Sequence, residues 1–429
     1  MKIDLLYGLD GLTVNIPEDI AVNVVRKHPM SPLTNPPQAV REALENPVKT
    51  FPLSELGRRA KTACIVICDI TRPVPNGMLL PQVIEALTRA GISKGNILIL
   101  VATGLHRPNE DNELREIIGS EEVFRSVRID NHFARDREAH VDLGKTSRGI
   151  PILIDRRFVE ADLKVAIGLI EPHFMAGYSG GRKVVAPGLA YQDTILRLHS
   201  AHILEDRNAG NCIMEGNPLH KEQIEIVREI GGIVALNVVI DEQRRIGFVN
   251  FGEIEASHLE AVEFVREYAE VSIPQRFKTI VTTSAGYPLD KTYYQTIKGM
   301  VGVIDILEPG GTIIIASECS EGMGSREFVI AQRRLCELGL DQFMSILERR
   351  EKALIDEWQT EMLVKALRLG SIKLYTTKLS EKNLNDVYVE QVSSIEEAIM
   401  ASVRDQADNK VAVVPEGPYV IPFFGGDQV

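Results

Sequence analysis

The sequence has no apolar run of the about 18 residues that a membrane-spanning helix needs. Its first twenty residues, MKIDLLYGLDGLTVNIPEDI, have a charge inside their only short apolar stretch, so they lack the core of a signal peptide. Basic residues are the minority, with 48 Lys and Arg against 60 Asp and Glu and a net charge of −12. Because neutralising phosphates requires concentrated Lys and Arg, we expect no nucleic-acid partner. The missing apolar run predicts no membrane partner.

Cysteine is also scarce. The five cysteines are scattered, and no two of them form a CxxC pair: Cys64, Cys68, Cys212, Cys319 and Cys336. An odd, scattered set argues against a disulfide framework or a zinc knuckle and predicts a cytoplasmic, reducing location. Cys64 and Cys68 stand within an apolar segment, where we expect buried thiols that pack as small hydrophobic groups.

Common nucleotide and metal motifs are missing as well. No GxGxxG occurs, which weakens the hypothesis of a nicotinamide-dependent dehydrogenase. The segment LGKTS around Lys145 resembles the end of a P-loop, but Ala139 stands where the first glycine should be. Neither HExxH nor HxH is present, so the protein alone offers no complete motif for a metal site.

What is present is an alternation of buried strands and amphipathic helices in a chain of 429 residues. Continuous apolar runs indicate strands buried on both faces of a parallel sheet, and they occupy residues 62–69, 96–102, 163–170 and 233–240. Helical patterns such as PQVIEALTRAGI lie between them. The predicted fold class is therefore α/β with mainly parallel sheets.

A second domain is indicated by a break at SIPQRF, after which the strand–helix alternation restarts with a strand at 278–283 and a helix from about Leu289. We predict two α/β domains with the active site in the cleft between them. The predicted bounds are 1–272 for a catalytic and cofactor-binding domain, 273–413 for a C-terminal domain, and 414–429 for an apolar tail that packs back on the body.

Polar side chains follow each buried strand of the first domain. Asp69 and Arg72 follow the first strand, His106 follows the second, and His173 and Lys183 follow the third. Ligands of open α/β sheets bind beyond the carboxyl ends of the strands, so we expect these groups to meet at one edge. Two histidines there suit acid/base chemistry, because imidazole titrates near neutral pH.

The segment EPHFMAGYSGGRK (171–183) combines His173 with three glycines and two cations. Gly177, Gly180 and Gly181 leave backbone N–H groups able to approach an anion. Arg182 is expected to lower the pKa of neighbouring Lys183 by like-charge repulsion.

Two helices carry further candidates. His199 shares the inward face of its helix with Ile195 and Leu196 and forms a His-x-x-His pair with His202. This pair is a metal site or, the favoured interpretation from the residues alone, a packing and salt-bridge pair. In the second domain, Tyr294, Gln295 and Lys298 share one helical face. This face is a polar patch that either closes over the cleft, which makes the three residues candidates for substrate binding, or lies in solvent.

Five separated segments together resemble the nickel-dependent lactate racemase family: DITRPVP, TGLHRP, EPHFMAGYSGGRK, the helix with His199, and YYQTIK. The resemblance extends over nearly the whole chain, in order and with compatible spacing. It implies a nickel-pincer nucleotide, a pyridinium mononucleotide whose ring carbon and two sulfur atoms bind nickel. It also implies that Lys183 holds this cofactor covalently, that His199 is the fourth nickel ligand, and that cofactor-biosynthesis proteins are partners.

The same resemblance implies roles for the other candidates. His106 and His173 would be the acid/base pair, while the α-hydrogen of a small 2-hydroxy acid moves as hydride to the cofactor and back. Arg72 and Lys298 would hold the substrate carboxylate, with Gln295 assisting. Contacts to the cofactor would come from residues 69–72 and from the glycines, named individually as Asp69, Ile70, Thr71, Arg72, Gly177, Gly180 and Gly181.

The resemblance leaves the substrate open. Lactate is the default, and malate, a longer 2-hydroxy acid or a sugar acid are alternatives of the same class. Tyr287, Pro288 and Leu289 are expected to set the choice of side chain. Alternatives of another class are a nicotinamide-dependent 2-hydroxy acid dehydrogenase and a non-catalytic cofactor-binding protein.

Overall fold

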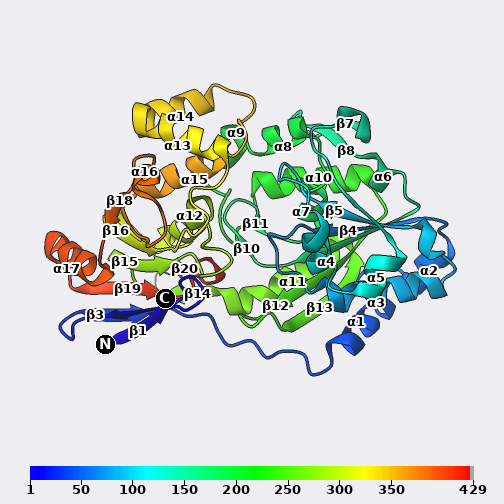
Figure 1. Ribbon diagram of the computed structural model, residues 1–429, viewed down its shortest axis with the longest axis horizontal. Coiled ribbons are helices and arrows are strands. Elements are labelled where there is room, and N and C mark those ends of the chain that lie inside the picture. Colours follow the sequence, from blue (N-terminus) through cyan, green and yellow to red (C-terminus); the bar gives the residue numbers. More distant parts are fainter. Residues whose placement is uncertain (426–429) are drawn as a thin grey trace. The chain divides into compact units, whose positions relative to one another are not determined.

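In the computed structural model, which describes residues 1–425, the predicted α/β fold class is confirmed, with two six-stranded and mainly parallel sheets. The chain divides into two units, which are described separately (Figure 1). The middle unit consists of Pro29–His199 and Asp206–Glu267, and the terminal unit consists of Met1–His28, Ser200–Glu205 and the residues from Tyr268 on.

The sheet of the middle unit contains all four strands predicted for the first domain. Its strand order is β13 (Ile246–Glu253), β12 (Ile233–Ile240), β9 (Leu163–Leu169), β4 (Ala63–Cys68), β5 (Ile97–Ala102) and β6 (Arg128–Asn131). Five of these strands run parallel, and only β13 is antiparallel to its neighbour. The predicted bounds are correct to within one or two residues, because each strand is an apolar run that ends where polar residues begin.

On one face of this sheet, every second residue of the central strands packs into a single buried cluster. Ala63, Ile65 and Ile67 of β4 belong to the same buried cluster as every second residue of β5 and β9. Helices α1 (Pro36–Glu45) and α3 (Asn76–Arg89) complete this cluster with their apolar stripes. Cys64 lies buried on the strand between these positions, and burial raises the pKa of its thiol, as expected of a packing residue.

The other elements of the middle unit are further helices and two hairpins. The helices are α2 (Leu53–Arg58), α4 (Asp111–Ile118), α5 (Glu121–Ser126), α6 (Arg156–Val159), α7 (Arg182–Val185), α8 (Gln192–Leu198), α10 (Pro218–Ile230) and α11 (Ile254–Ala269). The hairpins are β7 (His140–Lys145) with β8 (Pro151–Asp155), and β10 (Pro172–His173) with β11 (Gly177–Tyr178).

The terminal unit has its own parallel sheet, in the order β18 (Glu390–Val392), β17 (Gly370–Tyr375), β16 (Leu307–Ala316), β15 (Phe277–Thr283), β19 (Lys410–Val414) and β3 (Ala21–Val24). Figure 1 shows α17 (Ile395–Gln406) packed beside β15 and β19. The remaining elements are β1 (Lys2–Leu5), β2 (Leu12–Asn15), α9 (Ala201–Leu204), β14 (Glu270–Ile273), α12 (Tyr293–Val301), α13 (Arg326–Leu338), α14 (Leu340–Glu348), α15 (Glu357–Leu367), α16 (Glu381–Leu384) and β20 (Ile421–Phe424).

The two units divide the chain differently from the predicted domains. The first 28 residues lie with the C-terminal sheet, because β3 pairs in parallel with β19 and forms one edge of that sheet. Within the predicted tail, β20 pairs with β14, and Val420 and Ile421 are buried. The last four residues of that tail, 426–429, lie outside the described part of the chain. No helix in residues 1–425 is long and apolar enough to span a membrane.

Candidate active site

The candidate site of the middle unit begins at three neighbouring strand ends. Strands β9, β4 and β5 are adjacent and parallel, so their carboxyl ends reach the same edge of the sheet. Asp69 follows β4, the turn with His106 follows β5, and the hairpin with His173 follows β9. The topology therefore brings together the segments that were expected to meet.

Asp69 and His106 form a hydrogen-bonded pair. His106 Nδ1 lies 2.6 Å from Asp69 Oδ2, and the Thr71 hydroxyl donates to Asp69 Oδ1 over 2.5 Å. Burial alone would raise the pKa of Asp69, but the hydrogen bonds and charge of His106, together with Thr71, hold it below its ordinary value. The ionised carboxylate accepts the Nδ1 proton, which leaves the lone pair of His106 on Nε2. Asp69 was expected to contact the cofactor, and its contact with His106 was not foreseen.

His173 is held in the opposite arrangement. His173 lies in the first strand of the β10–β11 hairpin, and its ring is buried. Its Nδ1 accepts hydrogen bonds from the backbone N–H groups of Met175 and Ala176 over 3.3 and 3.2 Å. Two donors at Nδ1 place the ring proton of neutral His173 on Nε2. His106 thus presents a lone pair at Nε2, whereas His173 presents a proton there. The hydrogen-bond partners of Nδ1 in each ring account for this difference.

Arg72, predicted to hold a substrate carboxylate, forms an ion pair with Glu171. The backbone N–H of Glu171 is in turn hydrogen-bonded to the Ser179 hydroxyl. Glu171 was missed as a functional candidate, although it stands directly before Pro172 at the end of β9. Its carboxylate orients the guanidinium and compensates its charge at this partly buried position.

Lys183 lies on α7, which packs against β9 and β4. Desolvation, together with the nearby positive charge of Arg72, lowers the pKa of Lys183 to about 8. Arg182 acts in the expected direction, but its effect ranks behind burial and Arg72. The predicted cause was therefore the minor one. A lysine in this setting is partly neutral near pH 7–8, as nucleophilic attachment requires.

Arg182 itself does not point to the surface. Its side chain is fully buried, and its guanidinium donates to the carbonyls of Ala176 and Tyr178 and to Nε2 of His258. Arg182 thus ties together the loop between His173 and Lys183. Gly177 in this loop has φ +76°, and a Cβ there would lie 2.4 Å from the carbonyl oxygen of Ile213, so only glycine fits.

His199 follows α8 and differs from His202, the other member of the pair. The His199 ring is buried, Nδ1 donates to the carbonyl of Ile195 over 2.8 Å, and His202 is exposed. Burial lowers the pKa of His199 to about 4, and the charge of Lys183 contributes. The ring is therefore neutral with its lone pair on Nε2, the form that binds metal ions. Within residues 1–425, no group of three or more His, Cys, Asp or Glu side chains completes a metal site.

Three predicted residues lie in the terminal unit, on α12. This helix begins at Tyr293 rather than near Leu289, because residues 286–291 form a turn held by Asp290 before Thr292 caps the helix. The Tyr294 hydroxyl accepts a hydrogen bond from Trp358. Gln295 Oε1 is buried without a hydrogen-bond partner, and Lys298 lies one turn from Tyr294. Tyr287, predicted to select the substrate, is 49% exposed.

Comparisons with known proteins agree over most of the chain. The family model of the lactate racemase N-terminal domain matches residues 7–211, and that of the lactate racemase C-terminal domain matches residues 274–422. A lactate racemase from Thermoanaerobacterium thermosaccharolyticum is 33% identical over 98% of this chain and 99% of its own. A lactate racemase from Lactiplantibacillus plantarum is 32% identical over 90% of each.

Solved structures give the same result. The structure of the lactate racemase apoprotein from T. thermosaccharolyticum superposes with a TM-score of 0.91 at 31% identity, covering 98% of this chain and 100% of that one. A protein from Thermotoga maritima shares the fold, with a TM-score of 0.68 at 19% identity over 93% of this chain and 100% of that one. From the two family matches and the full-length relatives, the chain belongs to the lactate racemase family, whose curated members are isomerases.

Proposed function

We propose that this protein racemises a small 2-hydroxy acid, with lactate as the first substrate to test. Membership of the lactate racemase family supports the reaction class. The observation that carries the proposal is the pairing of Asp69 with His106 near the partly buried Lys183, at the end of β4. This arrangement supports a proton acceptor at His106 and an attachment point for a cofactor at Lys183, both in the middle unit.

The chain's own residues fit a nickel-pincer nucleotide. Lys183, with a pKa of about 8, has the neutral fraction that a covalent link needs, and neutral His199 has its Nε2 lone pair as a nickel donor. His199 would be the only protein ligand of nickel, which agrees with a pincer nucleotide that supplies three nickel ligands of its own. When bound, this group supplies a centre that accepts a hydride from the substrate α-carbon and returns it.

Proton transfer falls to the two histidines. His106, held by Asp69, takes the hydroxyl proton at Nε2, and the Asp69 carboxylate stabilises the imidazolium that results. His173 presents its Nε2 proton to the substrate oxygen. The two enantiomers present their hydroxyl groups in different positions. A racemase therefore needs proton-transfer groups on two sides of the substrate, which two separate histidines provide.

We assign the substrate carboxylate to Arg72 of the middle unit and to Lys298 and Gln295 of the terminal unit, where Tyr294 shares α12 with the latter two. Arg72 is already oriented by Glu171, so a carboxylate meets a guanidinium of fixed geometry. The Oε1 of Gln295, which has no hydrogen-bond partner within residues 1–425, could accept a hydrogen bond from a bound substrate, because most buried polar atoms in proteins are paired. Asp69, Ile70, Thr71, Gly177, Gly180 and Gly181 are proposed to line the cofactor. We place the protein in the cytoplasm, where cofactor-making proteins must load it.

The cofactor assignment is tested by intact mass and nickel content. The full chain is produced with and without the cofactor-making proteins, and the adduct is mapped by peptide mass. We expect an adduct on Lys183 that is absent from Lys183→Ala, and nickel that is lost in His199→Ala while the adduct stays. No adduct on the fully loaded protein, or nickel retained in His199→Ala, contradicts the assignment.

A further inference from the structure

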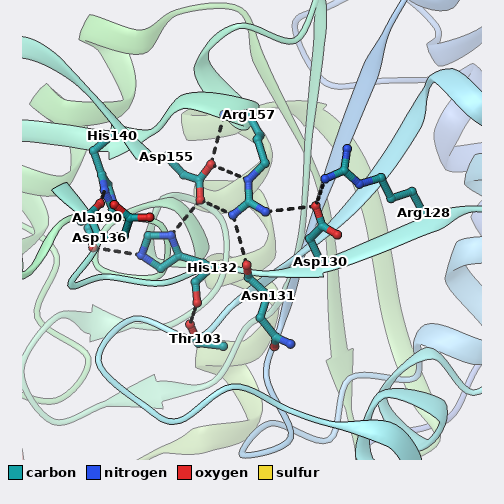
Figure 2. Close-up of polar contacts among 10 residues, drawn as sticks. All are labelled: Thr103, Arg128, Asp130, Asn131, His132, Asp136, His140, Asp155, Arg157 and Ala190. Carbon is teal, nitrogen blue, oxygen red and sulfur yellow. Dashed lines mark hydrogen bonds and ion pairs between the residues drawn. The ribbon is translucent and has the colours of Figure 1, made fainter. Parts of the chain in front are cut away.

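A buried polar cluster lies in the middle unit beside the proposed site, and none of its side chains has a role there (Figure 2). Its centre is His132, which directly follows β6 and whose side chain is fully buried. Nδ1 of His132 lies 3.0 Å from Asp155 Oδ2, and Nε2 lies 3.1 Å from the carbonyl oxygen of Ala190 (Figure 2). The ring is thus clamped between two other segments of the chain.

Both partners of the His132 ring accept hydrogen bonds and neither can donate one. A backbone carbonyl has no proton, and Asp155 is ionised. Burial alone would raise the pKa of Asp155, but hydrogen bonds from His132 and Arg157 hold it well below its usual range. Each ring nitrogen of His132 therefore faces an acceptor, so both hydrogen bonds form only when both nitrogens carry a proton. The other groups facing the ring are neutral His140, edge-on at 5.1 Å, and the Arg157 guanidinium, which also binds Asp130.

The backbone of His132 holds the turn that carries His106. Its N–H donates to Val101 at the end of β5, over 3.0 Å. Its carbonyl accepts the buried hydroxyl of Thr103 over 2.7 Å, as Figure 2 shows. The carbonyl of Thr103 then accepts the N–H of His106 over 2.9 Å. Two hydrogen bonds therefore separate the His132 backbone from the proposed proton acceptor.

The ring of His132 holds a different catalytic segment. Ala190 belongs to the stretch 186–191, which joins the helix of Lys183 to the helix that precedes His199. The same stretch accepts a second hydrogen bond in the cluster, since the N–H of Asp155 donates to the Leu189 carbonyl over 3.0 Å. Gly104, in the His106 turn, donates to the Gly188 carbonyl over 3.0 Å. The two segments thus contact each other directly and share His132 as a common anchor.

We propose that His132 is a positioning residue that sets the place of His106 relative to the chain carrying Lys183 and His199. The inference rests on the proposed roles of those three residues. Only a doubly protonated imidazole offers two rigid, divergent N–H donors in this volume; an amide side chain would turn its oxygen toward one of the two acceptors. Proton transfer is sensitive to such placement, because a displacement of about 1 Å can lower a rate by about 100-fold.

The test uses two variants that weaken the two sides of this anchor. His132→Gln removes one ring donor, and Thr103→Val removes the hydroxyl that links His132 to the His106 turn. In folded, nickel-loaded protein we expect each variant to lower kcat by about 10- to 100-fold with nearly unchanged KM. The double variant should lose less than the product of the two losses, since both act through one element. Thr146→Val is the matched control: it removes a buried hydroxyl that caps a turn of the same unit, and its kcat should stay at the wild-type value.

A second measurement does not depend on activity or on His132→Gln folding. In the full-length apoprotein with ¹⁵N-labelled histidine, NMR should show slowly exchanging protons on both ring nitrogens of His132 at neutral pH. A single protonated nitrogen overturns the proposal, as does wild-type kcat in folded, loaded Thr103→Val and His132→Gln. An equal fall of kcat in Thr146→Val also overturns it, because the loss would then be general.

The racemase activity of His106→Ala tests the proposed function separately from the positioning role of His132. Full racemase activity in that variant removes His106 from proton transfer. If His106→Ala is inactive while both anchor variants are fully active, only the positioning role of His132 fails.

Discussion

Asp69 and Lys183 show how burial acts in opposite directions on an acid and a base at neighbouring positions. Desolvation raises the pKa of the carboxyl and lowers that of the ammonium, because it disfavours the charged form of each. At Asp69 the hydrogen bonds of His106 and Thr71 outweigh burial, so the group stays ionised. At Lys183 the nearby Arg72 adds to burial, so the group is easily deprotonated. These opposite shifts suit the proposed roles of Asp69 as an orienting carboxylate and of Lys183 as the attachment point of a cofactor.

The first prediction concerns Asp69→Asn. The amide keeps the size of the side chain but removes the charge that stabilises an imidazolium at His106, so we expect racemase kcat to fall by about 10- to 100-fold. Rates are measured in both directions by chiral chromatography on protein with equal Lys183 adduct. Asp162→Asn is the control, since Asp162 accepts backbone N–H groups of Lys61 and Thr62 before β4 begins. Equal rates for the Asp69 variant and the wild type would remove the pair from the mechanism.

The second prediction concerns the stability of the apoprotein at different pH values. The folded-state pKa of Lys183 is about 8 and the ordinary value is 10.5, so between these values the unfolded chain holds a proton that the folded chain has lost. Stability contributed at this site therefore rises with pH across that window. We expect Lys183→Met to be more stable than the wild type at pH 7, with a difference that shrinks by pH 9.5. Urea unfolding at both pH values measures it, and a pH-independent difference would contradict the shift.

At the scale of elements, the strands of the middle unit were predictable from the sequence. The hairpin and the side-chain pairs that form the site were only partly predictable. Apolar runs such as ACIVIC of β4 indicate a strand that is buried on both faces of the sheet. The helices between such runs indicate that the strands are parallel. The hairpin β10–β11 was read only as a glycine loop, because its two-residue strands are too short to show alternation. The Arg72–Glu171 and Asp69–His106 pairs join residues 99 and 37 positions apart, and no local pattern encodes such contacts.

The third prediction tests why this hairpin contains Gly177. Gly177→Ala places a Cβ 2.4 Å from a backbone oxygen that cannot rotate away, so the hairpin that carries His173 must shift. Gly144→Ala is a matched control, because Gly144 also has a positive φ of +98° but has no atom within 4 Å of an added Cβ. We expect Gly177→Ala to lose about 1–3 kcal/mol more unfolding free energy than the control. Equal losses in urea unfolding would mean that backbone conformation alone, and not the close approach, requires glycine.

At the scale of the whole molecule, the restart of the strand–helix alternation near residue 272 indicated two α/β bodies, but the sequence did not assign the chain ends to them. Strand β3 is only AVNV, and its partner β19 lies almost 400 residues away. Ile3, Leu5 and Val14 of the same N-terminal segment belong to the buried cluster of the terminal unit. Pairing over such distances depends on the finished sheet edge, which periodicity does not reveal. The family resemblance, by contrast, was evident from five short motifs, and the comparisons confirm it.

The central claim concerns the reaction of the whole protein, and optical rotation tests it most directly. The nickel-loaded chain is incubated separately with the two pure enantiomers of lactate, without any nicotinamide cofactor, and the rotation is followed to its end point. We expect both samples to converge on zero rotation, with no net formation of the 2-keto acid, and we expect Lys183→Ala to leave both unchanged. If neither lactate nor any other 2-hydroxy acid of an enantiopure panel loses rotation, or if conversion requires a nicotinamide and accumulates the 2-keto acid, the account is contradicted.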